Sequence, residues 1–187
     1  MAKEELKSPQ RRTLTKRLIR EALLSLLRTN SIQKISVRAL CDMAGIHRTT
    51  FYHHYNDTYE VLAEIEQEFL AQLSMEETHI RNTAELEHHI ESLYLRLQQS
   101  QEAAVILLEN NADPYFFDKL LAVQDHGMIW KQLNNTYSPD ECALLRDFLN
   151  NGAYAVMLRW LKNGCQQSPK QVAGLLAKTI QQGVVLK

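Results

Sequence analysis

Helix-type hydrophobic periodicity runs through almost the whole chain, and it limits the folds that this sequence can adopt. Between residues 13 and 29, apolar side chains recur three and four positions apart, as they do in an amphipathic helix. Sustained alternation of polar and apolar residues, which would indicate a strand, is almost absent. The sequence therefore predicts an all-α protein.

Two short helices near the start of the chain are separated by a single glycine. Ser36 is typical of an N-cap and Gly45 of a C-cap, so together they bound a helix over 37–44. A second short helix is expected over 48–55, after a three-residue turn. With the amphipathic helix over 13–29 in front of them, this spacing predicts a helix-turn-helix with a supporting helix.

Further helices are expected after the helix-turn-helix. Asp57 or Thr58 can cap the first of them. The sequences SPDE (138–141) and SPKQ (168–171) each combine Ser at the N-cap, Pro at the first helical position and Glu or Gln at the third, which is a capping box. We therefore expect about nine helices in all, with the later ones over residues 59–73, 84–99, 101–110, 114–134, 139–163 and 169–185.

Basic residues are concentrated at the start of the chain. Residues 1–56 hold eleven Lys or Arg and four Asp or Glu, a balance of +7, whereas residues 57–187 hold ten and eighteen, a balance of −8. Such an asymmetry between segments indicates a basic, nucleic-acid-binding head on an acidic body.

Several other classes of protein are disfavoured. No run of eighteen apolar residues indicates a membrane span, and the start MAKEELKSPQRR lacks the apolar core of a secretory signal, so we expect a cytoplasmic protein with no membrane partner. Cys41, Cys142 and Cys165 are an odd number and far apart, which predicts reduced core residues rather than disulfides or a zinc knuckle. No nucleophile motif, phosphate loop or pair of catalytic acids is present, so we expect neither an enzyme nor a cofactor.

The segment HRTTFYHHY (47–55) carries most of the functional information. It could be a metal site, but His47, His53 and His54 lack the three- or four-residue spacing that places two imidazoles on one face of a helix. It could belong to the core, and for Phe51 and Tyr55, which are four residues apart, we expect that. The remaining side chains are hydrogen-bond donors of varied length with no acidic residue among them, which fits a surface that contacts a polyanion.

A helix-turn-helix inserts the start of its second helix into the major groove of DNA. Arg48 at that position can donate two hydrogen bonds to guanine, and Thr49 can offer a hydroxyl or a methyl group to thymine. Thr50, Tyr52 and His54 are expected to donate to phosphates, which fix the register of the protein on the duplex without reading its sequence. No metal ligand is predicted.

The segment AGIHRTTFYHHYNDTYEVL (44–62), preceded by ISVRALCDM and by a helix that ends in LLRTN, resembles the DNA-binding head of the TetR/AcrR family of bacterial transcription regulators. The resemblance covers residues 12–70. It implies that Arg38, Arg48, Thr49 and His53 lie near base edges, and that Thr50, Tyr52 and His54 lie mainly at phosphates. One position departs from the family pattern: Thr58 stands where family members usually have a phosphate-binding Lys. We expect Thr58 to donate a hydroxyl hydrogen bond there, without the ionic bond that a lysine would make.

The resemblance also implies the organisation of the rest of the chain. We expect a flexible basic arm over 1–10, a DNA-binding domain over 11–58 and a helical regulatory and dimerisation domain over 59–187. Residues 150–180 are similar to the C-terminal part of one TetR subgroup, in which the last two helices pair across a two-fold axis. The dimer contacts are predicted to include Ala155, Leu158, Leu161 and Leu175; the alternative is that these residues belong to the core of one chain.

An effector site is expected in the body, and its residues are harder to predict. Aromatic residues at helical spacing are more often plain core than a ligand site. The candidates for effector contact are Tyr94, His126 and Trp130.

These observations predict a sequence-specific transcription regulator, a ligand-responsive homodimeric repressor that binds a palindromic DNA operator and an unknown small-molecule effector. The alternative is a regulator of the same fold that acts through a protein partner instead of DNA. The basic head argues against this alternative, and the missing Lys at position 58 favours it.

Overall fold

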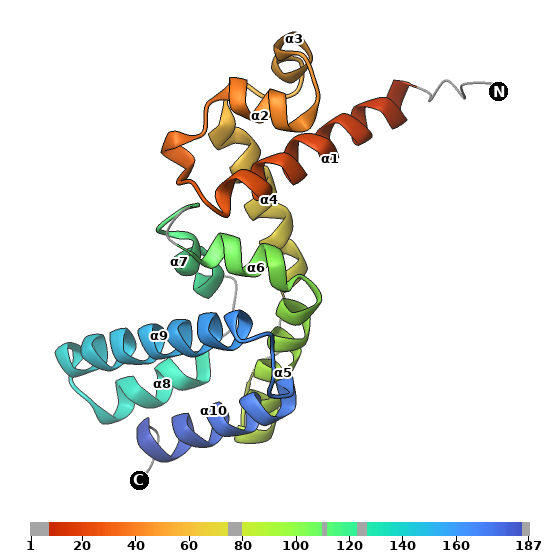
Figure 1. Cartoon of the computed structure of the whole chain (residues 1–187). Coiled ribbons are helices and arrows are strands. Elements are labelled where there is room, and N and C mark those ends of the chain that lie inside the picture. The colour runs from red at the N-terminus through yellow and green to blue at the C-terminus, as the bar shows by residue number, and fades with distance from the viewer. Residues whose placement is uncertain (1–7, 75–79, 110–111, 123–126, 185–187) are drawn as a thin grey trace.

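In the computed structural model, which describes residues 8–74, 80–109, 112–122 and 127–184, the chain forms an elongated all-helical molecule (Figure 1). Over these residues there are ten α-helices, one short 3-10 helix and no strand, which confirms the predicted fold class. None of the helices in the described part of the chain is long and apolar enough to cross a membrane.

The first helices form a separate cluster at one end of the molecule (Figure 1). Helix α1 (Ser8–Leu27) packs on α2 (Val37–Ala44), and α2 in turn contacts α3 (Arg48–Tyr52). A 3-10 helix, η1 (Ile32–Lys34), fills the connection between α1 and α2. The predicted caps of α2 are confirmed: the Ser36 side chain accepts a hydrogen bond from the Ala39 N–H, and Gly45 is left-handed with φ of 66°.

Helix α4 (Thr58–Leu73) runs from this cluster into the rest of the molecule, and Asp57 caps its start by accepting the Glu60 N–H. Two basic residues of α1 bind the side of α4. The Nζ of Lys16 lies 2.7 Å from a carboxylate oxygen of Glu64, and Arg20 lies 3.4 Å from the other. These ion pairs, together with buried apolar side chains, hold α4 against α1.

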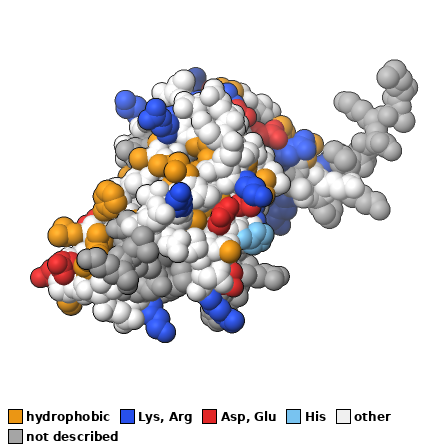
Figure 2. Space-filling model, turned by 90° about the horizontal axis from the view of Figure 1, so that it is seen from below, with side chains coloured by type: hydrophobic (Ala, Val, Ile, Leu, Met, Phe, Trp, Pro, Cys, Tyr) orange, Lys and Arg blue, Asp and Glu red, His pale blue; other side chains and the backbone are white. Residues whose placement is uncertain are grey.

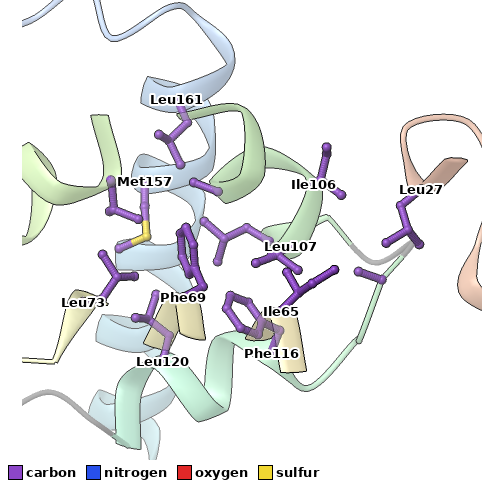
Figure 3. Close-up of a cluster of buried hydrophobic side chains, with 14 of the residues drawn as sticks. Leu27, Ile65, Phe69, Leu73, Ile106, Leu107, Phe116, Leu120, Met157 and Leu161 are labelled. Atoms are coloured by element: carbon purple, nitrogen blue, oxygen red, sulfur yellow. The ribbon is translucent and has the colours of Figure 1, made fainter. Parts of the chain in front are cut away.

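The body is built around a long pair of helices, α5 (Thr83–Gln99) and α10 (Pro169–Val184), which lie side by side. Its apolar centre brings together Phe69 of α4, Leu107 of α6, Phe116 of α7 and Met157 of α9 (Figure 3). The remaining helices are α6 (Gln101–Leu108), α7 (Phe116–Ala122), α8 (Gly127–Thr136) and α9 (Pro139–Lys162).

Both predicted capping boxes are present at the last two helices. Ser138 and Glu141 exchange side-chain and backbone hydrogen bonds at the start of α9, and Ser168 and Gln171 do the same at the start of α10. Gly164, with φ of 73°, lies in the turn after α9. The three cysteines are free and buried, as expected.

Three helix boundaries differ from those predicted. Helix α1 begins at Ser8, so residues 8–10, which were expected in a flexible arm, are helical, whereas residues 1–7 lie outside the described residues. Helix α3 ends at Tyr52 instead of residue 55, because the last residues of the segment form a turn. In place of the single helix predicted over 114–134, the described residues contain α7 over Phe116–Ala122 and α8 over Gly127–Thr136, and residues 123–126 lie outside the described part of the chain.

Candidate nucleic-acid interface

The orientation of α3 is set by two aromatic side chains of the HRTTFYHHY segment. Phe51 is completely buried and Tyr55 is 2% exposed, and their ring centroids lie 5.9 Å apart. Burial of such large rings stabilises the head by about 2–3 kcal/mol each, so the helix cannot rotate about its axis without disrupting the core. The prediction that this pair belongs to the core is confirmed.

Fixing Phe51 inward turns the polar residues of α3 outward. Arg48, Thr49 and His53 are exposed, and Tyr52 is 58% exposed even though its ring packs edge-on against Phe51. Thr50 and His54 are half-buried at the margin of the same surface. The structure therefore places all six predicted residues of this segment where a ligand can reach at least part of their side chains.

Arg38 is carried by α2 and is also exposed. Its Nε lies 3.8 Å from an Asp42 carboxylate oxygen, and both side chains are about three-quarters exposed. A pair this long and this solvated contributes less than about 1 kcal/mol. The guanidinium can therefore exchange Asp42 for another partner at little cost.

Basic residues of α1 lie near the HRTTFYHHY segment, which the motif alone did not identify. Burial lowers the pKa of His54, and the positive charges of Arg12, Lys16 and His53 lower it further. His54 is therefore a neutral imidazole near pH 7 in the free protein. The charge balance of residues 1–56 was the sequence signal for this basic environment, but it could not say which basic residues lie beside α3.

The structure corrects the role predicted for Thr58. Its side chain is only 4% exposed, and its hydroxyl donates to the Ile35 carbonyl oxygen at 3.5 Å. The start of α4 is already capped by Asp57, and Glu60 accepts hydrogen bonds from the backbone and side chain of Asn56. The prediction that the Thr58 hydroxyl faces a phosphate is therefore wrong, because this hydroxyl points into the junction with the segment before α2.

Tyr94, one of the three predicted effector residues, lines an apolar cavity of about 250 Å³ in the body. The cavity lies between α5, α7, α9 and α10, and its walls include Leu93, Phe148 and Met157. Tyr94 is 2% exposed and packs against Trp160, and its hydroxyl has no hydrogen-bond partner among the described residues. Of the other two candidates, Trp130 lies in α8 and His126 lies outside the described residues.

His89 and Phe148 also line this cavity, although sequence reasoning did not select them. Their residue types gave no signal, because His89 follows another histidine on an amphipathic helix and Phe148 has the helical spacing of a core residue. Burial raises the pKa of Tyr94, so its hydroxyl stays protonated and can both donate and accept a hydrogen bond.

The predicted dimer residues fall into two groups. Leu175 is 66% exposed and Ala155 is exposed, whereas Leu158 is half-buried and Leu161 is completely buried. The contact predicted for Leu161 is therefore wrong, because its side chain fills the core shown in Figure 3. Apolar side chains gather on the lower face of the molecule, on the side where α8 and α9 join (Figure 2).

Comparisons with known proteins agree with this geometry. Residues 84–182, about half of the chain, match a TetR-family model described as the C-terminal region of a transcriptional regulator. No curated protein matches the chain significantly in sequence.

Solved structures of the same architecture cover nearly the whole chain. A TetR transcriptional regulator from Streptococcus agalactiae 2603V is 22% identical, with a TM-score of 0.66 over 92% of this chain and 96% of that one. The TetR family regulator PfmR from Thermus thermophilus is 19% identical, with a TM-score of 0.60 over 90% and 98%. The fatty acid degradation regulator FadR from Bacillus halodurans is 13% identical, with a TM-score of 0.60 over 98% and 100%.

The matched C-terminal region, the helix-turn-helix with its outward polar face, and the shared architecture lead to one assignment: the chain belongs to the TetR family of transcriptional regulators.

Proposed function

We propose that the protein is a homodimeric, ligand-responsive repressor that binds a palindromic DNA operator through α3. The observation that carries this proposal is the division of the HRTTFYHHY segment, which contains α3, into a buried aromatic side and an exposed polar side. Phe51 and Tyr55 are buried, whereas Arg48, Thr49, Tyr52 and His53 are exposed. The packing of the head does not require hydrogen-bond donors on that outer side. Binding to a polyanion with base edges does require them.

Each exposed side chain has a role on DNA that follows from its chemistry. Arg48 would donate two hydrogen bonds to a guanine, and Thr49 and His53 would contact neighbouring base edges. Thr50, Tyr52 and His54 would donate to phosphates, with Arg38 reaching the groove from α2. The basic residues Arg12 and Lys16 of α1 would add attraction that does not depend on sequence.

A second copy of the chain is the natural partner of the apolar face on α9 and α10. Leu144 and Phe148 of α9 are 71% and 70% exposed, and Leu175 of α10 is 66% exposed. Exposure of such large apolar side chains to water is unfavourable. A symmetric contact between two copies would bury them. Two heads related by a two-fold axis would then read a palindromic operator.

The apolar cavity beside Tyr94 is the proposed effector site. A ligand of largely apolar surface, with one polar atom for the Tyr94 hydroxyl, fits walls of this chemistry. Phe148 lines the cavity and also belongs to the exposed face of α9, so a bound ligand would change the dimer contact. The effector would favour a dimer whose two α3 helices are wrongly spaced for the operator.

An electrophoretic mobility shift with the DNA that flanks the protein's own gene tests DNA binding. We expect a sequence-selective shift that weakens steeply as salt increases, because phosphate contacts release counterions. A matched fragment with the palindrome scrambled serves as the control. Absence of a selective, salt-sensitive shift would contradict DNA binding and favour the alternative, a regulator of this fold that acts on a protein partner.

A further inference from the structure

A groove of about 330 Å³ lies at the junction of the head and the body, away from both the α3 surface and the cavity beside Tyr94. Its walls come from three parts of the chain. Ile32 belongs to η1, Leu62 and Glu66 belong to α4, and Asp113 precedes α7, which contributes Lys119. A molecule in this groove would contact the head and the body at the same time.

Glu66 is an unusual residue for the inner side of α4. It is only 4% exposed, although a carboxylate loses several kcal/mol of hydration when it is buried. One carboxylate oxygen, Oε2, accepts a hydrogen bond from the Lys119 Nζ at 2.6 Å. The other, Oε1, accepts no hydrogen bond from any residue that the structure describes. Glu66 therefore lines the groove with a buried carboxylate that has one oxygen without a partner.

The charges of the groove do not balance. Lys119 is shared, because its Nζ lies 2.6 Å from Glu66 and 2.6 Å from Asp113. The two carboxylates and one ammonium leave a net charge of −1 when all three are ionised. Burial raises the pKa of Glu66, the Lys119 hydrogen bond and charge oppose this shift, and the charge of Asp113 adds to it.

Beside the polar Ser31 and Gln33, part of the groove is suited to an apolar group. Ile32 and Leu62 are buried in its wall, and Ala63 and the half-exposed ring of Tyr59 lie toward its opening. An occupant would therefore combine a positive, hydrogen-bond-donating end with a small apolar body. A bare metal ion fits poorly, because no cluster of three or more His, Cys, Asp or Glu side chains occurs among the described residues.

We propose that this groove is a second small-molecule site, which binds a small organic ammonium ion through Glu66 and packs its apolar part against Leu62 and Tyr59. The ammonium pairs with the Glu66 carboxylate and supplies the missing positive charge, while Lys119 keeps its bond to Asp113. This site is separate from the effector cavity, and it does not depend on the protein binding DNA.

Binding of phenethylammonium to the full-length protein, measured by isothermal titration calorimetry at pH 7.5, tests the proposal. We expect a dissociation constant of about 1 mM or lower. 2-Phenylethanol, which keeps the ring but lacks the charge, should bind at least about tenfold more weakly, because a hydrogen bond to a charged group contributes about 1.5–3 kcal/mol. No binding of phenethylammonium, or equal binding of the alcohol, would overturn the proposal.

Two variants locate the binding to this groove. Glu66→Gln keeps the shape of the side chain and removes its charge, and it should weaken phenethylammonium binding by about tenfold or more. Glu64→Gln is the matched control, because Glu64 lies on the same helix but faces Lys16 and Arg20 of α1. It should leave the affinity unchanged.

Ala63→Leu provides a test that leaves Glu66 and its ion pairs in place. Ala63 is exposed on α4 and lines the groove, so a larger side chain there should block the apolar group without opening the core. We expect binding to be abolished while the circular dichroism and the unfolding temperature stay unchanged. Retention of full affinity in Ala63→Leu or in Glu66→Gln would overturn the proposal.

Discussion

At the residue scale, α3 shows how one buried ring decides the function of its neighbours. Because Phe51 is fully buried at the centre of the head, the side chains two positions before it and one position after it are turned away from the core, at 100° of helix rotation per residue. Thr49 and Tyr52 are exposed for this reason. Their availability to DNA follows from the packing of Phe51 and not from their own chemistry.

Arg48→Ala tests direct readout of a base. We expect it to weaken operator binding by about 1–3 kcal/mol and to relax base preference at one position of each half-site. Fluorescence anisotropy with a set of operators substituted at single positions measures both effects. Arg81→Ala is the control, because Arg81 precedes α5, whose start lies at the opposite end of the molecule from α3 (Figure 1). Unchanged base preference in Arg48→Ala would contradict the proposed role.

Removal of single hydroxyl groups distinguishes Tyr52 from Thr58. Tyr52→Phe should weaken DNA binding by about 0.5–1.5 kcal/mol and leave the stability unchanged, because the Tyr52 hydroxyl is assigned to a phosphate and its side chain is 58% exposed. Thr58→Val should leave DNA binding unchanged and lower the free energy of unfolding. The loss should be about 1 kcal/mol or less, because the hydrogen bond from the Thr58 hydroxyl to Ile35 is long. Urea unfolding and DNA titrations at several salt concentrations measure the two effects. A weaker salt dependence of DNA binding in Thr58→Val would contradict this expectation and indicate that Thr58 contacts DNA.

At the scale of elements, α4 is the helix through which the head and the body are joined. It packs against α1 on one side and against α5 and α7 in the body. Its last turn is bound by Arg96 of α5, which donates to the carbonyl oxygens of Gln72 and Ser74 at 3.0 and 2.9 Å. A movement of α4 therefore has to change contacts with both parts of the molecule.

The α1–α4 ion pairs should make this contact sensitive to acid. Burial opposes ionisation of Glu64, but its hydrogen bond to Lys16 and the charges of Lys16 and Arg20 lower its pKa below the ordinary value of 4.5. A carboxylate with a lowered folded-state pKa stabilises the protein above its unfolded pKa, and this stabilisation is lost as the pH falls through the folded-state pKa.

Glu64→Gln should therefore lower the free energy of unfolding by about 1 kcal/mol at pH 7, and the difference should disappear as the pH falls below about 4. Urea unfolding followed by circular dichroism across this pH range provides the measurement. Glu21→Gln, which removes an exposed pair with Arg17 at 3.5 Å, is the control and should change the stability little at any pH. An undiminished effect of Glu64→Gln in acid would contradict the ion-pair explanation.

At the scale of the whole molecule, the chain leaves an apolar face uncovered. The exposed residues Leu144 and Phe148 of α9 and Leu175 of α10 come from helices that do not pack closely on each other in one chain. Their exposure supports the proposed dimer. The cavity beside Tyr94 lies between the same two helices, so effector and dimer would be coupled through them.

Phe148→Glu should convert the dimer to a monomer, because two charges would be buried in a symmetric contact without partners. Light scattering after gel filtration measures the mass. Leu95→Glu is the matched control, because Leu95 is 44% exposed on α5 and lies outside the proposed interface. The monomer should also bind a palindromic operator more weakly than the dimer does. A Phe148→Glu protein that keeps the dimer mass would contradict this assignment of the interface.

The sequence by itself determined the features that depend on neighbouring residues. Helical periodicity, the caps at Ser36, Asp57, Ser138 and Ser168, and the spacing of the helix-turn-helix involve residues a few positions apart, so they could be predicted correctly. The burial of Phe51 and Tyr55 followed from their four-residue spacing. Helix ends could not be predicted as closely, because the point at which a helix such as α3 ends depends on packing.

Only the tertiary structure decided which polar residues are buried and which apolar residues are exposed. Thr58 is satisfied by a carbonyl 23 residues earlier in the chain, and Glu66 is paired with a lysine 53 residues later. Leu161 and Leu175 have the same residue type and similar helical surroundings, yet one is fully buried and the other is 66% exposed. Burial depends on which distant segments pack together, and local periodicity carries no information about that choice.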